Sequence, residues 1–270
     1  MPEGHTLHRL ARLHQKLFAR RPVGVSSPQG RFAESAALID GRPMTRAEAH
    51  GKHLFHRYGP DLVVHVHLGL YGTFVEGEAP APAPVGQLRM RLVGETHYAD
   101  LRGPTACELI TSADVREIRK RLGEDPLRRD ADAERVWARI TKSRSPLATL
   151  LMDQAVVAGV GNVYRAELLF RHGLDPQLPG NRLERATWDA MWPDLVALMR
   201  DGVRRGRIDT VRREHDPRRR GEPGRKDRHG GEVYVYRRAG MPCLVCGTEV
   251  AHAEHANRNL FWCPVCQPAA

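Results

Sequence analysis

Four cysteines near the end of the chain have the spacing of a metal site. Cys243-x2-Cys246 and Cys263-x2-Cys266 are separated by 16 residues, which is typical of a zinc ribbon, where a hairpin joins two tight knuckles. Four thiolates suit one structural zinc ion in a closed tetrahedral site. Two disulfides or a redox pair are the alternatives; an intracellular setting disfavours the first, and the matching second pair disfavours the other. We expect the remaining cysteine, Cys107, to pack as a small apolar residue.

The N-terminus can supply a nucleophile if the initiator methionine is removed. Pro2 follows Met1, and a small residue at this position allows that removal. The new terminus would be a secondary amine, which can attack an aldehyde or an anomeric carbon and form an iminium ion. Glu3 could then transfer protons to and from the sugar. Many proteins begin with the same three residues, so this start alone indicates no function.

Two glycine-containing turns carry polar side chains that can hold a phosphate. Lys52 follows Gly51 in a turn that leads into a predicted strand, where a lysine can bind a phosphate, protonate a leaving group or simply face solvent. Gly159-Val160-Gly161-Asn162 lies between two apolar helical segments. Asn162 is placed to cap the helix that starts at Val163, and a helix N-terminus is a ready site for an anion. An ordinary helix hairpin is the alternative.

The predicted hairpin between the cysteine pairs combines an arginine with aromatic side chains. Arg258 is preceded by His252 and His255 and followed by Phe261 and Trp262. An arginine presented beside such rings can lie against a phosphate backbone. A solvated loop arginine is the alternative, and composition alone favours it.

The first part of the chain is predicted to be mostly β structure after one helix. Apolar residues at helical spacing predict a helix from about Thr6 to Phe18. The alternation over residues 62–68 predicts a half-buried strand. Residues 88–93 predict another strand, in which the inward-facing side chains are Leu88, Met90 and Leu92.

The remainder is predicted to be helical, after a linker at residues 123–133. The predicted helices span residues 134–140, 147–154, 163–171 and 183–199. Residues 202–231 are poor in apolar side chains and rich in arginine, which indicates a mobile basic loop. A strand is expected to begin at residues 233–236.

The charge of the chain favours an anionic partner. Its 270 residues include 42 Lys and Arg against 32 Asp and Glu, with a net charge of +10. Between Arg200 and Arg238 there are 14 basic and 7 acidic residues, as expected for a surface that contacts nucleic acid. Five cysteines exclude a disulfide-dense scaffold. No apolar run approaches the ~18 residues of a membrane span, and no signal region opens the chain. We therefore expect a cytoplasmic protein without membrane association.

These motifs occur together, and in this order, in one family. The chain resembles the bacterial formamidopyrimidine-DNA glycosylase and endonuclease VIII family through Met1-Pro2-Glu3-Gly4, Gly51-Lys52, Gly159-x-Gly161-Asn162 and the terminal cysteines. The resemblance covers nearly the whole chain. It implies an α+β multidomain fold with an N-terminal β-sandwich that carries an N-terminal helix, a helix–two-turn–helix domain and a C-terminal β-hairpin zinc finger. The expected domains are residues 1–122, 134–230 and 231–270, with residues 123–133 as the linker.

The resemblance also implies an activity and a role for each matching residue. The family consists of bifunctional DNA glycosylases and AP lyases of base excision repair, which act through a Schiff base and β,δ-elimination. By this resemblance Pro2 is the nucleophile, Glu3 opens the deoxyribose ring and Lys52 contacts the phosphate at the lesion. Asn162 and Arg258 are the other phosphate contacts. The implied partner is damaged DNA, as duplex, bubble or single strand, bound by a monomer with one structural zinc ion.

Four features show how the chain follows or departs from the patterns of the family and its branches. Leu70 and Tyr71, just after the first predicted strand, resemble the endonuclease VIII wedge that fills the space of a flipped base, which predicts oxidised pyrimidines as substrates; strand-end core is the alternative for this pair. Gly69 stands where that branch has Gln, and Thr6 where family members commonly have Glu. Asp100-Leu101-Arg102-Gly103 only partly matches the wedge of the formamidopyrimidine branch. An oxidised-purine glycosylase and a non-catalytic zinc-finger DNA-binding protein are the alternative functions.

Overall fold

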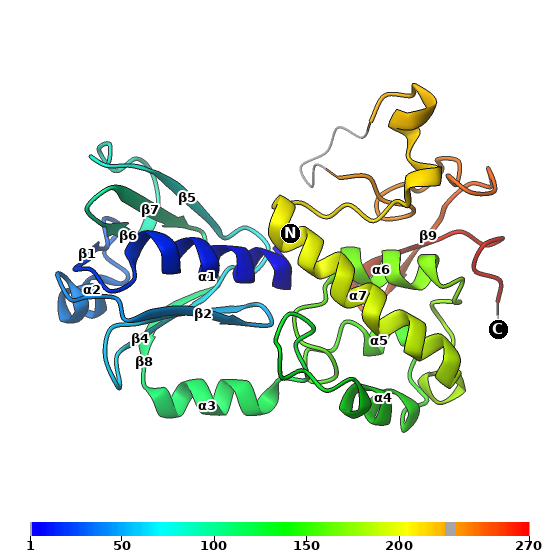
Figure 1. The fold of residues 1–270 in the computed structure, drawn as a ribbon, viewed down its shortest axis with the longest axis horizontal. Helices are drawn as coiled ribbons and strands as arrows, with labels where there is room; N and C mark the ends of the chain where they lie inside the picture. The colour runs from blue at the N-terminus through cyan, green and yellow to red at the C-terminus, as the bar shows by residue number, and fades with distance from the viewer. Residues whose placement is uncertain (1, 225–230, 270) are drawn as a thin grey trace. The chain divides into compact units, whose positions relative to one another are not determined.

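The chain divides into two compact units, Met1–Arg121 and Leu122–Ala270 (Figure 1). The computed structural model describes residues 2–224 and 231–269. The expected removal of Met1 and the middle of the expected basic loop lie outside the described residues. Each unit has its own apolar core. Within the described ranges, no helix is long and apolar enough to cross a membrane.

The first unit is a sandwich of two four-stranded antiparallel sheets, as expected. One sheet has the order β2-β3-β4-β8, formed by Arg46–His50, His53–Arg57, Val63–His67 and Ala106–Ile110. The other has the order β1-β6-β7-β5, formed by Gly24–Ser26, Leu88–Val93, His97–Arg102 and Thr73–Glu78. The helices of this unit are α1 (Gly4–Phe18), α2 (Ala33–Ile39) and α3 (Ser112–Arg121).

Side chains at the predicted spacing build the core of the first unit. Leu7 and Phe18 of α1 are buried, because apolar residues at helical spacing gather on one face of a helix. Leu88, Met90 and Leu92 of β6 are fully buried, as predicted. The core therefore joins α1 to the inner faces of both sheets.

Strand β4 is buried on both faces, which corrects the half-buried prediction. Val64 and Val66 belong to the sandwich core, as expected. Val63, on the other face, packs with Phe55 of β3 and Val115 of α3. Because α3 covers this part of the sheet, the alternation of side chains separates two buried environments rather than core and solvent.

The second unit is helical and ends in a β-hairpin. Its helices are α4 (Ala133–Thr141), α5 (Leu147–Leu150), α6 (Asn162–Arg171) and α7 (Arg185–Arg205), with 3-10 turns η1 (Gly180–Arg182), η2 (Arg213–His215) and η3 (Pro217–Arg220). The hairpin pairs β9 (Ala251–His255) with β10 (Arg258–Trp262). Each predicted helix is present, but α5 ends at Leu150, since the chain then enters a turn in which the Asp153 carboxylate accepts a hydrogen bond from the Ala155 amide.

The segments on either side of the helices differ from expectation. Residues 123–133, expected as a linker, form part of the second unit, and Leu127 packs in its core. Helix α7 extends to Arg205 and ends at Gly206, whose φ of 72° is the left-handed conformation common after helices. The first residues of the expected basic loop are therefore helical.

Residues 233–236 do not form the expected strand. The buried carboxylate of Glu167 in α6 accepts the backbone N–H groups of Tyr234, Val235 and Tyr236, at 2.6, 2.9 and 2.9 Å. Because one carboxylate satisfies three successive amides, this segment needs no partner strand. The side chains of all four residues 233–236 are instead buried in the core of the second unit.

Candidate functional site

The first residues of the chain lie at the end of the sandwich that carries the β2–β3 turn. His14 of α1 contacts His56 of β3, with 3.0 Å between Nδ1 and Nε2. Ala19, just after the helix, pairs with Met44, just before β2. Helix α1 therefore runs away from the turn, so that its first residues lie at the end of the sandwich that carries the turn (Figure 1).

The loop after β4 reaches the same end of the first unit. Strand β4 is antiparallel to β3, with His67 opposite His53, so the chain leaves β4 beside the β2–β3 turn. Leu70 and Tyr71 follow, and they are 45% and 84% exposed. Neither residue belongs to the core, which rules out the strand-end alternative. Large apolar side chains in such a position indicate a contact surface.

Gly69 has a backbone conformation that disfavours the glutamine of the endonuclease VIII pattern. Its φ is +66°, and a Cβ at this position would lie 1.9 Å from Thr105 Oγ1. A left-handed conformation costs a residue with a side chain ~1 kcal/mol or more, and Thr105 would also have to move. The backbone conformation of this loop and the position of Thr105 therefore favour glycine over the glutamine of the endonuclease VIII pattern.

Lys52 lies in a two-residue turn between paired strands. His50 pairs with His53 across the turn, and Gly51 has a φ of +56° whereas Lys52 has no positive φ, the pattern of a type II′ turn. The charge of Lys52 contributes to lowering the pKa of His67, after burial and His65. Because His53, which follows Lys52, lies opposite His67, the turn lies beside the end of β4, from which the loop with Leu70 and Tyr71 departs.

Glu3 and Thr6 occupy the first turn of α1. Glu3 is fully buried and Pro2 half-buried. The Glu3 carbonyl accepts the Thr6 amide at 2.9 Å, and the Thr6 hydroxyl lies 3.3 Å from Nε2 of His5. The glutamate that family members commonly have at this position is thus replaced by a hydroxyl that pairs with the adjacent imidazole.

Asp100 forms a buried ion pair with Arg91 of the neighbouring strand. Arg91 donates to both of its carboxylate oxygens, at 2.7 and 2.9 Å, and both side chains are buried. This two-point pair links β6 to β7. The segment from Asp100 that partly matches the formamidopyrimidine wedge therefore lies mostly in β7 rather than in an exposed loop.

In the second unit, a hydrogen bond from Asn162 reaches the residue that follows Arg258. Asn162 is the first residue of α6, and Gly161 rather than Asn162 occupies the cap position. Its side-chain amide donates to the backbone carbonyl of Asn259 at 2.9 Å, and its side-chain oxygen accepts from Arg165. Arg258 is exposed. Both predicted contact residues therefore lie where α6 meets the hairpin.

The four predicted ligand cysteines form one cluster. Their sulfur atoms all lie within 4.8 Å of one another, with 3.9 Å between Cys243 and Cys266 and 3.5 Å between Cys246 and Cys263. A tetrahedral zinc ion with Zn–S bonds of ~2.3 Å requires sulfurs ~3.8 Å apart. The donor set fits a single structural zinc site. Cys107 is separate from it and packs against the core of the first unit, where burial raises the pKa of its thiol to about 12.

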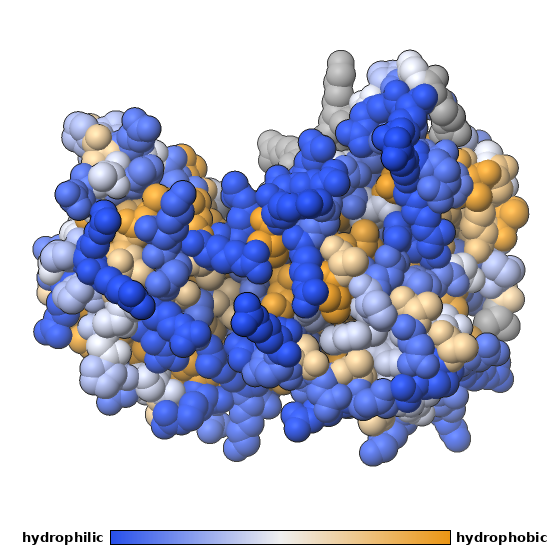
Figure 2. Space-filling view, in the orientation of Figure 1, coloured by the Kyte–Doolittle hydropathy of each residue, from blue (hydrophilic) through white to orange (hydrophobic). Residues whose placement is uncertain are grey.

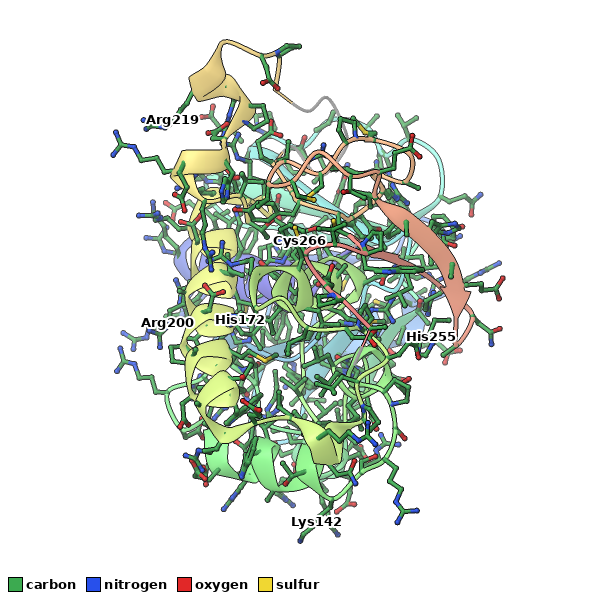
Figure 3. The ribbon with its side chains drawn as sticks, turned by 90° about the vertical axis from the view of Figure 1, so that its right-hand side faces the viewer. Lys142, His172, Arg200, Arg219, His255 and Cys266 are labelled. Atoms are coloured by element: carbon green, nitrogen blue, oxygen red, sulfur yellow. The ribbon has the colours of Figure 1, made fainter. Side chains whose placement is uncertain are left out.

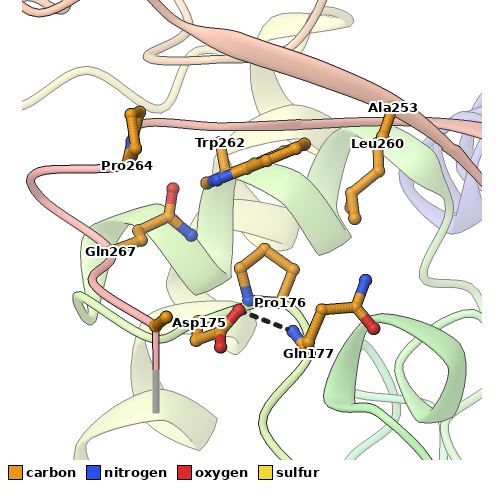
Figure 4. Close-up of a pocket in the computed structure, with 9 residues that line it drawn as sticks. Asp175, Pro176, Gln177, Ala253, Leu260, Trp262, Pro264 and Gln267 are labelled. Atoms are coloured by element: carbon orange, nitrogen blue, oxygen red, sulfur yellow. Dashed lines mark hydrogen bonds between the residues drawn. The ribbon is translucent and has the colours of Figure 1, made fainter.

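A cavity of about 460 Å³ lies between the hairpin and the loop after α6 (Figure 4). Trp262 and Leu260 form one wall and Pro176 lies opposite, with Asp175 and Gln177 beside it. Its lining is mostly apolar and contains neither a cysteine nor a lysine. Its charged lining residue, Asp175, accepts a hydrogen bond from the Gln177 amide.

The arginines in the last part of α7 and after it are only partly available to an anion. Asp209 pairs with three of them: Arg205, Arg207 and Arg218. Figure 3 shows Arg200 and Arg219 on the side of the second unit opposite to the hairpin. Hydrophilic residues cover much of the face seen in Figure 2. The predicted basic segment thus combines internal ion pairs with exposed arginines.

Two hydrogen-bonded Glu–His–His chains in the first unit were not predicted. Glu76, His14 and His56 form one inside the sandwich. Glu108, His65 and His53 form the other on the outer face of the β2-β3-β4-β8 sheet. The signal in the sequence is the recurrence of histidines at positions 53, 56, 65 and 67, but contacts between distant elements are needed to pair them.

Three family models match the chain in order. They are the formamidopyrimidine-DNA glycosylase N-terminal domain over residues 1–107, the formamidopyrimidine-DNA glycosylase H2TH domain over residues 122–213, and the zinc finger found in FPG and IleRS over residues 240–269. These matches cover the expected catalytic, helical and zinc-finger parts.

Full-length relatives match as well. Endonuclease 8 1 of Mycobacterium tuberculosis is 59% identical over 272 residues, covering 99% of this chain and 100% of the relative. Formamidopyrimidine-DNA glycosylase of Acidothermus cellulolyticus is 31% identical, covering 99% and 96%. The fold is similar to that of MutM in complex with DNA containing carbocyclic 8-oxo-G, with a TM-score of 0.79 at 20% identity and coverage of 99% and 100%.

The structural likeness at this low identity establishes the fold, and the full-length relatives establish descent. The matching domains occur in the order expected from the motifs. The chain therefore belongs to the formamidopyrimidine-DNA glycosylase and endonuclease VIII family.

Proposed function

We propose that this chain, a DNA glycosylase and AP lyase of base excision repair, removes oxidised pyrimidines from damaged DNA. The identity is 59% with an endonuclease 8 and 31% with a formamidopyrimidine-DNA glycosylase. The exposed Leu70 and Tyr71 also follow the endonuclease VIII pattern, whereas Asp100 is held in a buried pair. These features support the pyrimidine branch.

Pro2 is the proposed nucleophile. After removal of Met1 its secondary amine has a lone pair, whereas an acylated proline nitrogen has none. Attack on C1′ of the damaged nucleotide breaks the bond to the base, and the amine loses its proton. Opening of the bond between C1′ and the ring oxygen then gives an iminium ion. The iminium draws electrons from C2′, so that loss of a C2′ proton expels the 3′ phosphate. Loss of a second proton from the sugar expels the 5′ phosphate.

Glu3 and Lys52 are proposed to assist this reaction. Glu3, buried next to Pro2, donates a proton to the ring oxygen as the deoxyribose opens. Lys52, at the same end of the first unit, binds a phosphate that flanks the lesion and stabilises its charge. The observation that carries the proposal is this gathering of Pro2, Glu3, Lys52 and the exposed Leu70 and Tyr71.

The remaining contacts hold the DNA. A base inside a duplex must leave the stack before its sugar can be attacked, and Leu70 and Tyr71 are proposed to fill the space it leaves. Asn162 and Arg258 are proposed to bind phosphates. The four cysteines hold the zinc ion, which supplies structural support for the hairpin that carries Arg258. We propose that a monomer acts in this way on duplex, bubble or single-stranded DNA.

Borohydride trapping on DNA with one abasic site tests the mechanism. The processed protein is expected to form a covalent adduct, whereas Pro2→Gly should give little and a form that retains Met1 should give none. DNA binding without any adduct would overturn the lyase mechanism and favour a non-catalytic DNA-binding protein.

Lesion preference is tested with matched duplexes that carry thymine glycol or 8-oxoguanine at the same position. Faster single-turnover excision of thymine glycol is expected. Faster excision of 8-oxoguanine would instead assign the chain to the oxidised-purine activity.

A further inference from the structure

Histidines gather on the outer face of the sheet beside the Lys52 turn. His53 lies opposite His67, and His65 lies between Phe55 and Glu108 in the strand register. Residues directly opposite each other in antiparallel strands project from the same face. The side chains of β3, β4 and β8 therefore meet on the face that α3 covers farther along the sheet.

A directed hydrogen-bond chain runs through this face. Glu108 Oε1 lies 2.8 Å from His65 Nδ1, and His65 Nε2 lies 2.8 Å from His53 Nδ1. An ionised carboxylate only accepts, so His65 Nδ1 carries the hydrogen and its Nε2 accepts from His53 Nδ1. The chain thus fixes the tautomer and the orientation of both rings.

Stacking and neutrality add to this restraint. The His65 ring stacks on that of Phe55, with centroids 5.3 Å apart. Burial lowers the pKa of His53 to about 3, helped by His65, His67, His50 and the Arg121 charge. The pKa values of His65 and His67 are also lowered by burial. At neutral pH these imidazoles are uncharged. Glu108, the carboxylate of the hydrogen-bond chain, is already paired with His65.

The hydrogen-bond chain lies next to the Lys52 turn of the proposed site. His53 directly follows Lys52 in the sequence, so its ring fixes one end of the turn. His67, in edge contact with His53 at 5.0 Å between centroids, has its pKa lowered partly by Lys52. A lysine on a short turn loses less conformational freedom on binding phosphate when the turn is already held.

We propose that His53 is a positioning residue of the proposed active site, held by Glu108 and His65, and that it fixes the turn from which Lys52 binds the lesion phosphate. This inference rests on the proposed function of Lys52. His53, His65 and Glu108 act through Lys52 and do not themselves react.

The test is single-turnover cleavage of a duplex with one abasic site by His53→Phe, His53→Asn and Glu108→Gln. Phenylalanine keeps a ring but cannot donate to His65, whereas asparagine keeps an N–H donor near the position of Nδ1. His53→Phe is expected to lower the rate constant about 10- to 100-fold, the range of effects of a misplaced catalytic group. His53→Asn should recover most of the rate, and Glu108→Gln should lie between them.

The double variant with Lys52→Ala identifies the route of the effect. If His53 acts through Lys52, His53→Phe causes no further loss in the Lys52→Ala background. Glu76→Gln is the matched control, because it alters the inner Glu–His–His chain, which contacts α1 rather than the turn. It should lower thermal stability and leave the cleavage rate of the folded protein unchanged.

Three results would overturn the inference: an unchanged rate for His53→Phe and Glu108→Gln, a full additional loss in the Lys52→Ala background, or no rescue by asparagine. Glu108 is 54% exposed, so Glu108→Gln remains a folded test even if His53→Phe does not fold. Normal cleavage by Lys52→Ala itself would overturn the proposed role of Lys52 and this inference together, whereas additive losses would overturn this inference alone.

Discussion

The side-chain amide of Asn162 donates a hydrogen bond to the backbone carbonyl of Asn259, 2.9 Å away and one residue beyond Arg258. This contact joins the start of α6 to β10 across 97 residues of sequence. The two proposed phosphate contacts of the second unit therefore depend on one another, because the hairpin position of Arg258 is set partly by Asn162.

Asn162→Asp should weaken DNA binding by more than the loss of one contact. The carboxylate would face the Asn259 carbonyl without a proton to donate, and affinity for abasic-site duplex should fall about 10- to 100-fold, equivalent to about 1.5–3 kcal/mol for a charged hydrogen bond. Fluorescence anisotropy at several salt concentrations measures the effect, with Asn181→Asp, an exposed asparagine of η1, as the control. Arg258→Ala should then cost less in the Asn162→Asp background than alone; additive losses would show that the two contacts are independent.

Lys52→Ala should slow strand cleavage without unfolding the protein. Loss of one charge-assisted phosphate contact is expected to reduce the single-turnover rate about 10- to 100-fold. The side chain lies in a turn and outside both apolar cores, so the melting temperature should change little. Lys142→Ala, an exposed lysine at the end of α4, is the matched control. A Lys52→Ala protein as active as the control would remove Lys52 from the proposed mechanism.

Gly69→Ala should destabilise the first unit more than Gly86→Ala does. Both glycines have positive φ, +66° and +70°, but only at Gly69 would a Cβ meet a neighbour, Thr105 Oγ1 at 1.9 Å. Gly86→Ala should cost ~1 kcal/mol for backbone strain alone, and Gly69→Ala should add ~1–3 kcal/mol for overpacking. Chemical denaturation measures both. Adding Thr105→Ala should recover the steric part only; no recovery would show that the cost lies entirely in the backbone.

Removal of zinc should impair DNA binding and spare the first unit. Cys263→Ser leaves three thiolates, and a hairpin of this size depends on its metal for stability. Affinity for abasic-site duplex is expected to fall about tenfold or more, as for loss of the Arg258 contact, while hydrogen exchange of β2 to β8 stays unchanged. Cys107→Ser serves as the control for serine substitution. Wild-type affinity after verified zinc loss would contradict the role assigned to the hairpin.

Acid should loosen the first unit through its buried histidines. Burial lowers the pKa of His53 to about 3 and also lowers those of His56 and His65, whereas an imidazole in an unfolded chain titrates near ~6.5. Between these pKa values the unfolded state binds more protons than the folded state. The contribution of the buried histidines to the free energy of unfolding is therefore complete above about pH 6.5 and is lost as the pH falls below that value.

Hydrogen exchange of β3 and β4 amides, corrected for intrinsic rates, measures this effect between about pH 7.5 and about pH 5.5. Protection should be lower in acid, and His53→Asn should reduce the difference because it removes one of the shifted groups. An equal pH dependence in the two proteins would assign the effect to other groups.

Local patterns in the sequence were sufficient to predict secondary-structure elements and residues that can bind or react. Helical spacing predicted α1, the alternation of residues 88–93 predicted the buried face of β6, and two cysteine pairs predicted the zinc cluster. These features depend on neighbours within a few residues, so their physical cause is present in the local sequence.

Long-range contacts decided the rest. The pattern of residues 233–236 predicted a strand, but the distant Glu167 carboxylate takes the amides that a strand partner would have taken. Likewise, α3 buries the second face of β4, and only the register of β3, β4 and β8 brings His53, His65 and Glu108 into one chain. A sequence shows which groups can donate, accept or pack, whereas the tertiary structure determines which of them meet, because each such contact is selected among many competing partners by burial and register.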